Sequence, residues 1–186
     1  MYSSQTNFDS ETQVLTVDPT PEDRSWYAVH TKSRHEKRVA AQLTEQSVCT
    51  FLPLLVQLNR WSDRKRKVEV PLFSCYAFVR IAQTPEDRLH ILRTPGVLGF
   101  VGYDRRGTAI PQEQIESIQT ALRENIPCSP HAYIQTGKRV RIRGGSLDGV
   151  EGILERHGAD QSLIVSVELL RRSVSIRVAG YDVEVA

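Results

Sequence analysis

The order of strand and helix patterns in the first two thirds of the chain constrains its fold most. Apolar alternation typical of strands covers residues 26–31, 51–58, 75–81 and 97–101, and apolar spacing typical of amphipathic helices covers residues 33–47, 84–94 and 111–123. The resulting order, β-α-β-β-α-β followed by a helix, is the ferredoxin-like or split β-α-β pattern. We therefore predict an α+β domain over residues 24–126.

Two of these helices begin with capping signals. Ser33 and Glu36 have the spacing of a capping box, in which Ser33 is the N-cap and Glu36 returns to it. Thr84 precedes a proline and two acidic residues, which predicts a capped start with proline at the first helical position.

The strand at 51–58 is interrupted by Pro53, and the basic segment 59–67 after it is predicted to be a hairpin loop.

The pattern changes at Gly137. Residues 138–143 alternate, with Val140 and Ile142 on one face, and residues 163–169, 174–178 and 183–185 alternate in the same way. Several short strands over about fifty residues, separated by glycine turns, predict a small β-barrel in residues 137–186. Residues 127–136 contain two prolines and no apolar period, and we interpret them as a linker.

Charge is unevenly distributed along the chain. Residues 1–23 contain five acidic residues and no lysine or arginine, and we interpret them as a disordered tail. Residues 24–126 contain 16 basic and 10 acidic residues, so this domain is basic and its partner is predicted to be a polyanion. No apolar run could span a bilayer and no secretion signal is present, so we expect a cytoplasmic monomer without membrane contact.

Enzyme and metal chemistry have no support in the sequence. The three cysteines match no disulfide framework, zinc pattern or redox pair. The histidines at positions 30, 35, 90, 131 and 157 have no metal-ligand spacing, and the phosphate-loop and nucleophile-elbow patterns are absent. We therefore predict no catalysis, no metal and no cofactor.

The strand at 75–81 carries a candidate binding surface. One of its faces carries Tyr76, Phe78 and Arg80, and arginine is rarely buried without a partner. If that face is partly exposed to solvent, Tyr76 and Phe78 form an apolar patch of the kind that binds proteins. Alternatively, a helix covers both rings and Arg80 reaches solvent at the strand end.

Two basic clusters are candidates for nucleic-acid contact. Cations at a helix start oppose the helix dipole, yet four surround the start of the first helix: Lys32, Arg34, His35 and Arg38. Together with free backbone N–H groups they suit a phosphate backbone. The second cluster surrounds Trp61 and includes Arg64, Lys65 and Arg66, which suits phosphate contacts with stacking. The alternative for both clusters is a solvated surface.

Taken in order, several short motifs resemble the NusG family of transcription elongation factors over residues 24–186. The N-terminal motifs are Trp26-Tyr27, Glu36-Lys37-Arg38-Val39-Ala40, Pro71-Leu72-Phe73, Tyr76-Ala77-Phe78-Val79, Pro95-Gly96-Val97 and Gly99-Phe100-Val101-Gly102. The C-terminal motifs, which resemble a KOW domain, are Gly137-Lys138-Arg139-Val140-Arg141-Ile142, Leu147 and Gly152-Ile153-Leu154. The resemblance implies a NusG N-terminal domain followed by an SH3-like KOW barrel.

The resemblance also implies partners for particular residues. The clamp helices of the largest catalytic RNA polymerase subunit would bind the hydrophobic patch of His30, Phe73, Tyr76 and Phe78. The basic helix start would face the non-template DNA strand, and Asp87 and Arg88 would touch the second large polymerase subunit. KOW domains of relatives bind ribosomal protein S10 or the termination factor Rho. Leu147 occupies the position where those domains often have an aromatic residue that contacts the partner.

Departures from the general family pattern suggest a specialised paralogue. Ser74-Cys75 stands where general NusG proteins usually have Pro-Gly, the linker is short and the N-terminal tail is extra. The chain is therefore more similar to the RfaH, LoaP or UpxY kind, which suppresses pausing and termination at particular operons. Some relatives refold the KOW domain into helices, but the glycines and the strict alternation in this chain favour a stable barrel.

An RNA-recognition module is the strongest alternative. It has the same β-α-β-β-α-β order and an aromatic run on its third strand, which residues 75–81 approach. The basic residue and glycine that open that run are missing in this chain. The KOW-like C-terminal half favours the polymerase factor.

Overall fold

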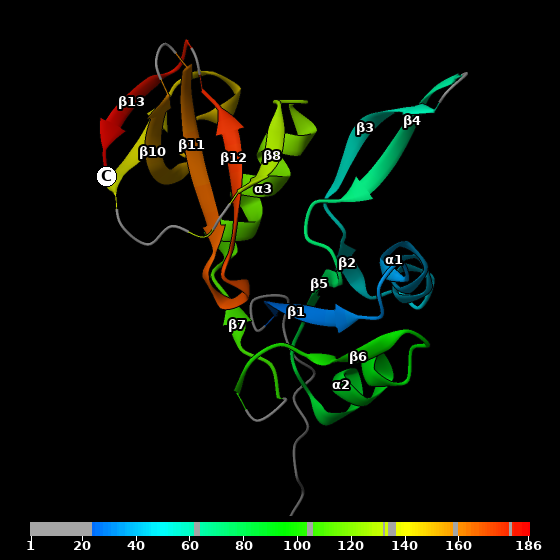
Figure 1. The fold of residues 1–186 in the computed structure, drawn as a ribbon. Helices are drawn as coiled ribbons and strands as arrows, with labels where there is room; N and C mark the ends of the chain where they lie inside the picture. Colours follow the sequence, from blue (N-terminus) through cyan, green and yellow to red (C-terminus); the bar gives the residue numbers. More distant parts are fainter. Residues whose placement is uncertain are drawn as a thin grey trace, which may run out of the picture.

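The computed structural model describes residues 24–61, 64–103, 106–131, 133, 137–157, 160–178 and 180–186. The predicted acidic tail at 1–23 lies outside the described residues. These described residues form a mixed α+β structure with three sheets, arranged as in Figure 1. No helix in the described ranges has the length and apolar character needed to cross a membrane.

The N-terminal sheet has the interleaved order that a split β-α-β pattern produces. Its strands are β1 (Ser25–Thr31), β2 (Cys49–Phe51), β5 (Tyr76–Ile81), β6 (Val97–Phe100) and β7 (Ala109–Ile110). Their order is β2-β5-β1-β6, with β7 also paired to β1, and every pair is antiparallel. The predicted order of helices and strands is confirmed for this sheet, with β7 as a further short strand that the sequence did not predict.

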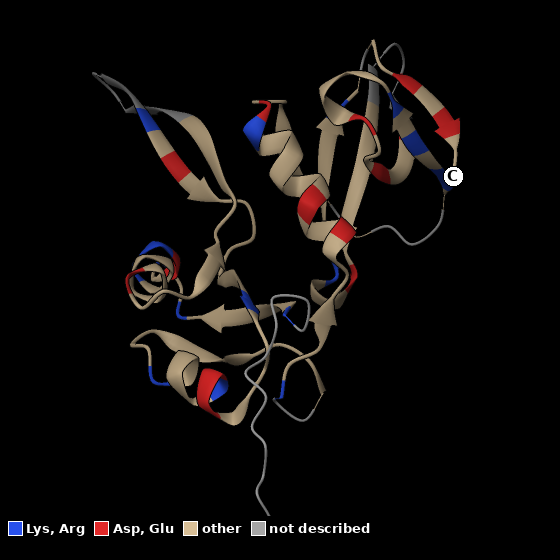
Figure 2. Cartoon of the chain, turned by 180° about the vertical axis from the view of Figure 1, so that it is seen from behind, with Lys and Arg blue, Asp and Glu red and all other residues tan. Residues whose placement is uncertain are grey.

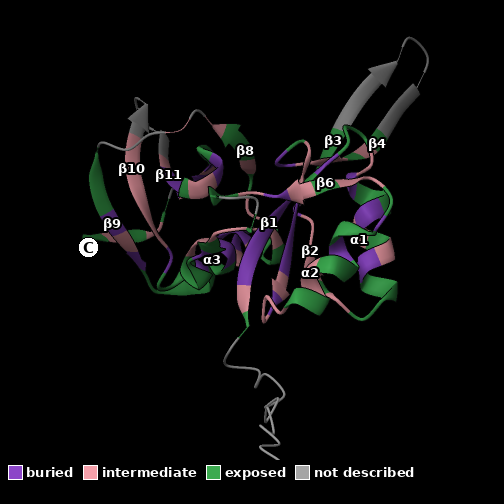
Figure 3. Cartoon of the chain, turned by 90° about the horizontal axis from the view of Figure 1, so that it is seen from below, coloured by how far each residue is buried: buried purple, intermediate pink, exposed green. Residues whose placement is uncertain are grey.

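Helices cover the two faces of this sheet unequally. Helices α1 (Glu36–Glu45) and α2 (Pro85–Leu92) cover one face, where Val39, Leu43 and Ile91 are buried in one core with Val29 and Val79. Helix α3 (Gln112–Arg123) lies on the opposite side of β1, as Figure 3 shows. It buries Ile115, Ile118 and Ala121 in a second core with Trp26 and Ala28.

One of the two predicted helix caps is confirmed and the other is wrong. Thr84 caps α2, because its hydroxyl accepts a 3.1 Å hydrogen bond from the Asp87 backbone N–H and Pro85 occupies the first turn. Helix α1 begins at Glu36 with His35 as its N-cap, and no side chain caps it. Ser33 is not the cap because Arg34 after it has a left-handed backbone, with φ of +63°, which cannot continue a helix.

The basic segment is part of a long hairpin, which differs from the prediction of a loop. Strands β3 (Leu54–Trp61) and β4 (Arg64–Pro71) form a separate two-stranded sheet, paired from Leu54↔Pro71 to Trp61↔Arg64. The strand predicted at 51–58 is thus two strands, β2 and β3, which are separated at Pro53 because proline cannot donate to a ladder.

The C-terminal half is all-antiparallel sheet, as its alternation predicts. The strands are β8 (Cys128–His131), β9 (Lys138–Arg143), β10 (Glu151–His157), β11 (Asp160–Val167), β12 (Arg172–Arg177) and β13 (Asp182–Val185), in the order β13-β9-β10-β11-β12-β8. Val140 and Ile142 of β9 are buried, which confirms the face that the sequence assigned to the core.

Strand β8 lies within the segment that we interpreted as a linker. Residues Cys128–His131 pair with β12 from Ile176 to Ser173, at the edge of the sheet. An edge strand tolerates proline because one side of its backbone needs no ladder hydrogen bonds, so Pro130 does not prevent pairing. Only residues 124–127 separate α3 from β8.

Helix α3 joins the two halves of the molecule. It packs against β11 and against the 3₁₀ helix η3 (Gly145–Leu147), and Gln114 Oε1 accepts a 3.3 Å hydrogen bond from the Glu168 backbone N–H. The core cluster on this side of β1 is therefore continuous, from Trp26 through Ile118 to Leu147 and Val165.

The partial burial of Cys128, at the start of β8, predicts that its thiol reacts slowly. Burial raises the pKa of the Cys128 thiol to about 11, whereas Cys49 is exposed. Cys128 therefore retains its proton well above the pH at which a free thiol ionises, and we expect it to be alkylated at least about tenfold more slowly than an ordinary exposed cysteine. Its rate should keep rising up to about pH 11.

A short iodoacetamide pulse followed by peptide mass spectrometry measures this difference. In denaturant the three cysteines should react at similar rates, which provides the control. Equal rates for Cys128 and Cys49 in the folded protein would contradict the burial of Cys128.

Candidate protein and nucleic-acid interface

An aromatic pair lies on the face of the N-terminal sheet that carries Trp26 and Ala28. His30 of β1 pairs with Tyr76 of β5, and their ring centroids are 5.4 Å apart. Along β1, side chains 26, 28 and 30 share this face, and α3 covers the Trp26 end. His30 is exposed and Tyr76 is half-buried, so the far end of the face presents both rings to solvent.

Phe78 and Phe73 do not extend the exposed surface of this pair. Phe78 has an exposed fraction of 0%, and Phe73 is also buried. The Phe78 ring lies 6.1 Å from Phe51 of β2 and 5.8 Å from Phe73, which precedes β5. The prediction that Phe73 and Phe78 are accessible beside Tyr76 is therefore wrong: Phe78 points to the predicted face, but β2 and the turn before β5 cover it.

Strand β6 adds a residue that the sequence did not single out. The β1–β6 register shifts between His30 and Thr31, which is a β-bulge, and Gly99 pairs with His30. A side chain at Gly99 would meet nothing within 4 Å, and its neighbour Leu98 is 54% exposed. Leu98 therefore adds apolar surface at the sheet edge next to His30.

A groove separates the β3–β4 hairpin from α3 and β8. Its volume is about 400 Å³, and β3 lines one side with Leu54, Leu55 and Val56. Leu122, Ile126 and the start of β8 line the other side. Leu55 and Ile126, which line this groove, pack against the same core cluster as Tyr76.

The predicted basic cluster at the start of α1 lies at the surface. Lys32, Arg34 and Arg38 are exposed, and the half-buried ring of His35 is held by a 3.0 Å hydrogen bond between Nδ1 and the Ser33 carbonyl. This cluster directly follows β1, so it begins two residues after His30.

The hairpin lies beside α1. Lys37 of α1 forms a 2.9 Å ion pair with Glu69 of β4. Figure 2 shows basic positions on both α1 and the hairpin. The first three residues of β4 are Arg64, Lys65 and Arg66, which pair with residues 59–61 of β3. The structure describes their backbone but not their side chains.

Asp87 and Arg88 lie in the first turns of α2. The Arg88 guanidinium lies over the Phe100 ring, 5.9 Å from its centroid, and both residues of the Asp87–Arg88 pair are half-buried. Part of Arg88 is therefore committed to packing inside the domain. Both residues belong to the helix that covers the sheet face opposite Tyr76.

Leu147 does not present a contact surface. Its exposed fraction is 0%, and it belongs to the core cluster that includes Ile115 and Ile118 of α3. The prediction that Leu147 is accessible to a partner is wrong in this arrangement, because η3 packs on α3.

Two of the four basic residues of β9 are paired with carboxylates. Arg141 pairs with Glu151 and Arg143 pairs with Glu184. The hydrogen bond and charge of Arg143 lower the pKa of the Glu184 carboxyl. This strand is therefore a less favourable polyanion surface than the start of α1.

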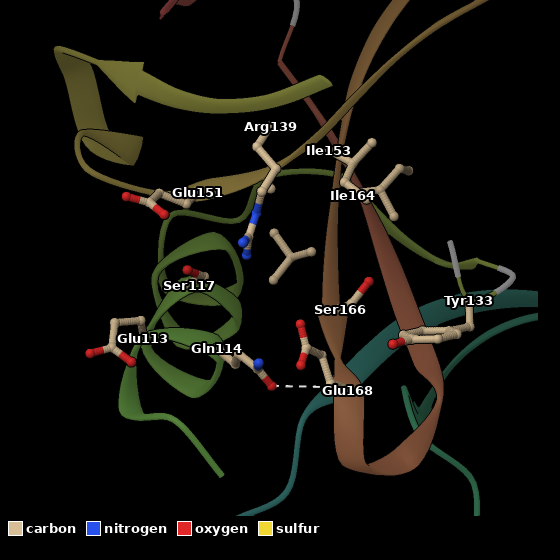
Figure 4. A pocket seen from close by; sticks show the side chains of 12 residues that line it. Glu113, Gln114, Ser117, Tyr133, Arg139, Glu151, Ile153, Ile164, Ser166 and Glu168 are labelled. Atoms are coloured by element: carbon tan, nitrogen blue, oxygen red, sulfur yellow. Dashed lines mark hydrogen bonds between the residues drawn. The ribbon is translucent and has the colours of Figure 1, made fainter. Parts of the chain in front are cut away.

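A second cavity, of about 280 Å³, lies between α3 and the C-terminal sheet. Figure 4 shows Arg139 pointing into it from β9 toward α3, with Glu113, Glu151 and Glu168 around it. Its lining mixes carboxylates, one guanidinium and aliphatic side chains. No group of three or more His, Cys, Asp or Glu side chains in the described parts of the chain could hold a metal ion.

Comparisons with known proteins point to one family. The family model described as "Transcription termination factor nusG" matches residues 24–119. The transcription termination/antitermination protein NusG of Staphylococcus carnosus is 26% identical over 176 residues, which covers 87% of this chain and 95% of that protein. The protein of the same name from Staphylococcus aureus strain Mu50 is 28% identical over 177 residues, with the same coverage.

A solved structure on domain interaction in Thermotoga maritima NusG also matches. It covers 82% of this chain and 92% of its own, at 18% identity and a TM-score of 0.46.

Proposed function

Because the chain belongs to the NusG family of transcription termination and antitermination factors, we propose that it binds RNA polymerase through His30 and Tyr76 and DNA through the start of α1. Members of this family are transcription factors and not enzymes. The clamp helices of the largest polymerase subunit are the proposed protein partner, and the upstream non-template strand is the proposed DNA.

The observation that carries this proposal is the adjacency of the two surfaces. His30 and Tyr76 form a ring pair that is partly exposed, and Leu98 of the neighbouring strand β6 is 54% exposed. Lys32 and Arg34 follow on the same chain segment. A partner that covers the rings therefore has a phosphate-binding surface immediately beside it.

In the mechanism that we propose, the protein acts as a tether. The aromatic face anchors it on the clamp, while the basic start of α1 and the basic half of the β3–β4 hairpin hold the DNA. The start of α2, at Asp87 and Arg88, is the proposed contact with the second large subunit across the cleft. Binding the closed, elongating polymerase better than the open one shifts the population toward elongation.

We further propose that the protein is a specialised paralogue that suppresses pausing and termination at particular operons. The moderate identity to general NusG proteins and Ser74-Cys75 before the strand tyrosine support this proposal. The C-terminal sheet is proposed to be a KOW domain that meets ribosomal protein S10 or Rho. Contact through Leu147 would require that sheet to separate from α3, because the side chain is buried.

The RNA-recognition alternative is less well supported. Such a module stacks bases on exposed aromatic rings of its central strands. The ring of Phe78 on β5 is buried, and α3 packs on Trp26 of β1.

A pausing and termination assay tests the proposal. It uses the cognate polymerase and templates with and without the upstream region of the gene's own operon. We expect longer transcripts on the template that carries this region. Binding to polymerase in the absence of RNA separates a polymerase factor from an RNA-recognition module, and failure to bind would contradict the proposed function.

Charge reversal tests the DNA surface. The double substitution Arg34→Glu and Arg38→Glu should weaken DNA binding and lower the slope of log affinity against log salt by about 0.7 for each single-strand phosphate that the protein no longer neutralises. Polymerase binding without DNA should be unchanged.

The matched control is Arg172→Glu with Arg177→Glu, which reverses two exposed arginines of β12 in the C-terminal sheet. This control should leave the salt slope unchanged. An equal fall in slope for both double variants would indicate a net-charge effect and contradict a local DNA site.

A further inference from the structure

A buried carboxylate connects the start of α1 to the turn before β5. Glu36 is only 5% exposed, and its Oε1 accepts a 2.8 Å hydrogen bond from the Cys75 backbone N–H, 39 positions away in the sequence. Burial of a carboxylate is costly unless hydrogen bonds compensate it, and the first turn of a helix favours a negative charge. Glu36 therefore supplies the acceptor at a position where its charge is tolerated.

The turn that receives this hydrogen bond is strained. Cys75 has φ of +69°, a left-handed conformation that costs free energy for any residue with a Cβ. Its carbonyl accepts a 2.8 Å hydrogen bond from the Thr31 N–H, so both backbone groups of Cys75 are held by other elements. Such a conformation persists only where its surroundings determine it.

The strained residue directly precedes the proposed polymerase contact. Tyr76 follows Cys75, its N–H donates a 3.3 Å hydrogen bond to the Phe73 carbonyl, and its ring lies beside His30. If Cys75 relaxed to a negative φ, the chain would enter β5 in another direction. The Tyr76 ring would then move away from its place beside His30.

We propose that Glu36 is a positioning residue for polymerase binding, because its carboxylate holds the Cys75 turn in the conformation that presents Tyr76. This inference rests on the proposed function. Glu36 is also the first residue of α1, so the same side chain fixes the aromatic face relative to Arg34 and Arg38.

Two substitutions of Glu36 test the role. Glu36→Ala removes the acceptor, so the binding-competent turn becomes a minor conformation and the apparent polymerase affinity should fall by about tenfold. Glu36→Gln keeps an amide oxygen at the same position and should stay within about threefold of the wild type, since a neutral acceptor is weaker than a charged one.

A second-site substitution separates local positioning from global stability. Cys75→Gly removes the strain of a positive φ, and in the Glu36→Ala background it should restore affinity to within about threefold of the wild type. The matched control is Ser47→Gly after α1, where φ is +64°. It relieves the same kind of strain away from the turn and should not restore affinity.

Amide hydrogen exchange provides a local readout. The Cys75 N–H is protected by its bond to Glu36, so Glu36→Ala should speed its exchange, while Glu36→Gln should change it little. Exchange of buried strand amides such as Val29 should change less than that of Cys75 if the effect is local.

The outcomes are distinguishable. A wild-type protein that does not bind polymerase contradicts the proposed function. Wild-type binding with unchanged affinity for Glu36→Ala contradicts only the positioning role. Equal rescue by Ser47→Gly and Cys75→Gly would also overturn it, because it would show that global stability alone limits binding.

Discussion

Replacing Phe78 by alanine is expected to lower the free energy of unfolding by about 3–5 kcal/mol, the range for large aromatic residues in well-packed cores. The side chain is fully buried, and its ring lies close to those of Phe51 and Phe73. Removing it leaves a cavity that β2 and the turn before β5 would have to close. Denaturant unfolding followed by far-UV circular dichroism measures the change.

The control for this prediction is an exposed aromatic residue on the same domain. Tyr103 is 88% exposed, so Tyr103→Ala should change the stability by no more than about 0.5 kcal/mol. A decrease below about 1 kcal/mol for Phe78→Ala would contradict the packing described for this ring.

Replacing Tyr76 by alanine is expected to act on binding rather than on folding. If Tyr76 is a central anchor of the polymerase contact, its truncation should cost about 2 kcal/mol or more of binding free energy, roughly a thirtyfold fall in affinity. His30→Ala should act in the same direction because the two rings lie together. Titration of labelled protein with polymerase, without nucleic acid, measures the affinity.

Tyr103→Ala is again the matched control, because it removes an exposed aromatic ring elsewhere and should leave the affinity unchanged. Unchanged affinity for Tyr76→Ala would contradict the aromatic face as the binding surface. Combining alanines at Tyr76 and Phe78 would not be informative, since unfolding and removal of the binding ring would give the same result.

The features that sequence patterns predicted correctly depend on local chemistry. Alternation in β9 places Val140 and Ile142 in the core because side chains of a strand point to opposite faces. The Thr84 cap requires only residues within one helical turn. The element order of the first domain follows from such local signals taken in sequence.

The features that the patterns missed depend on distant segments. Alternation gives the face of Phe78 correctly, but only the position of β2 and the turn before β5 decides whether that face is covered. The Ser33–Glu36 spacing suits a capping box, yet Glu36 bonds to Cys75, 39 positions away. Strand β8 exists because β12 supplies its ladder, and no local signal in Cys128–His131 predicts a strand.

In the candidate site, too, some residues could be identified from the sequence and others only from the fold. Tyr76 and the exposed cations after β1 could be identified from residue type and spacing, whereas His30 was identified only through the family resemblance. Leu98 required the bulge between β1 and β6, and the groove required the long hairpin; neither is visible in the periodicity.

The short stretch between α3 and β8 limits how far the C-terminal half could travel. Because an extended chain spans at most about 3.6 Å per residue, residues 124–127 give a reach of roughly 14 Å if the half came away with β8 still paired to β12. The start of β8 would therefore stay within little more than a helix diameter of the end of α3. Even after such a separation the two halves would remain neighbours, unlike domains that are joined by a long flexible linker.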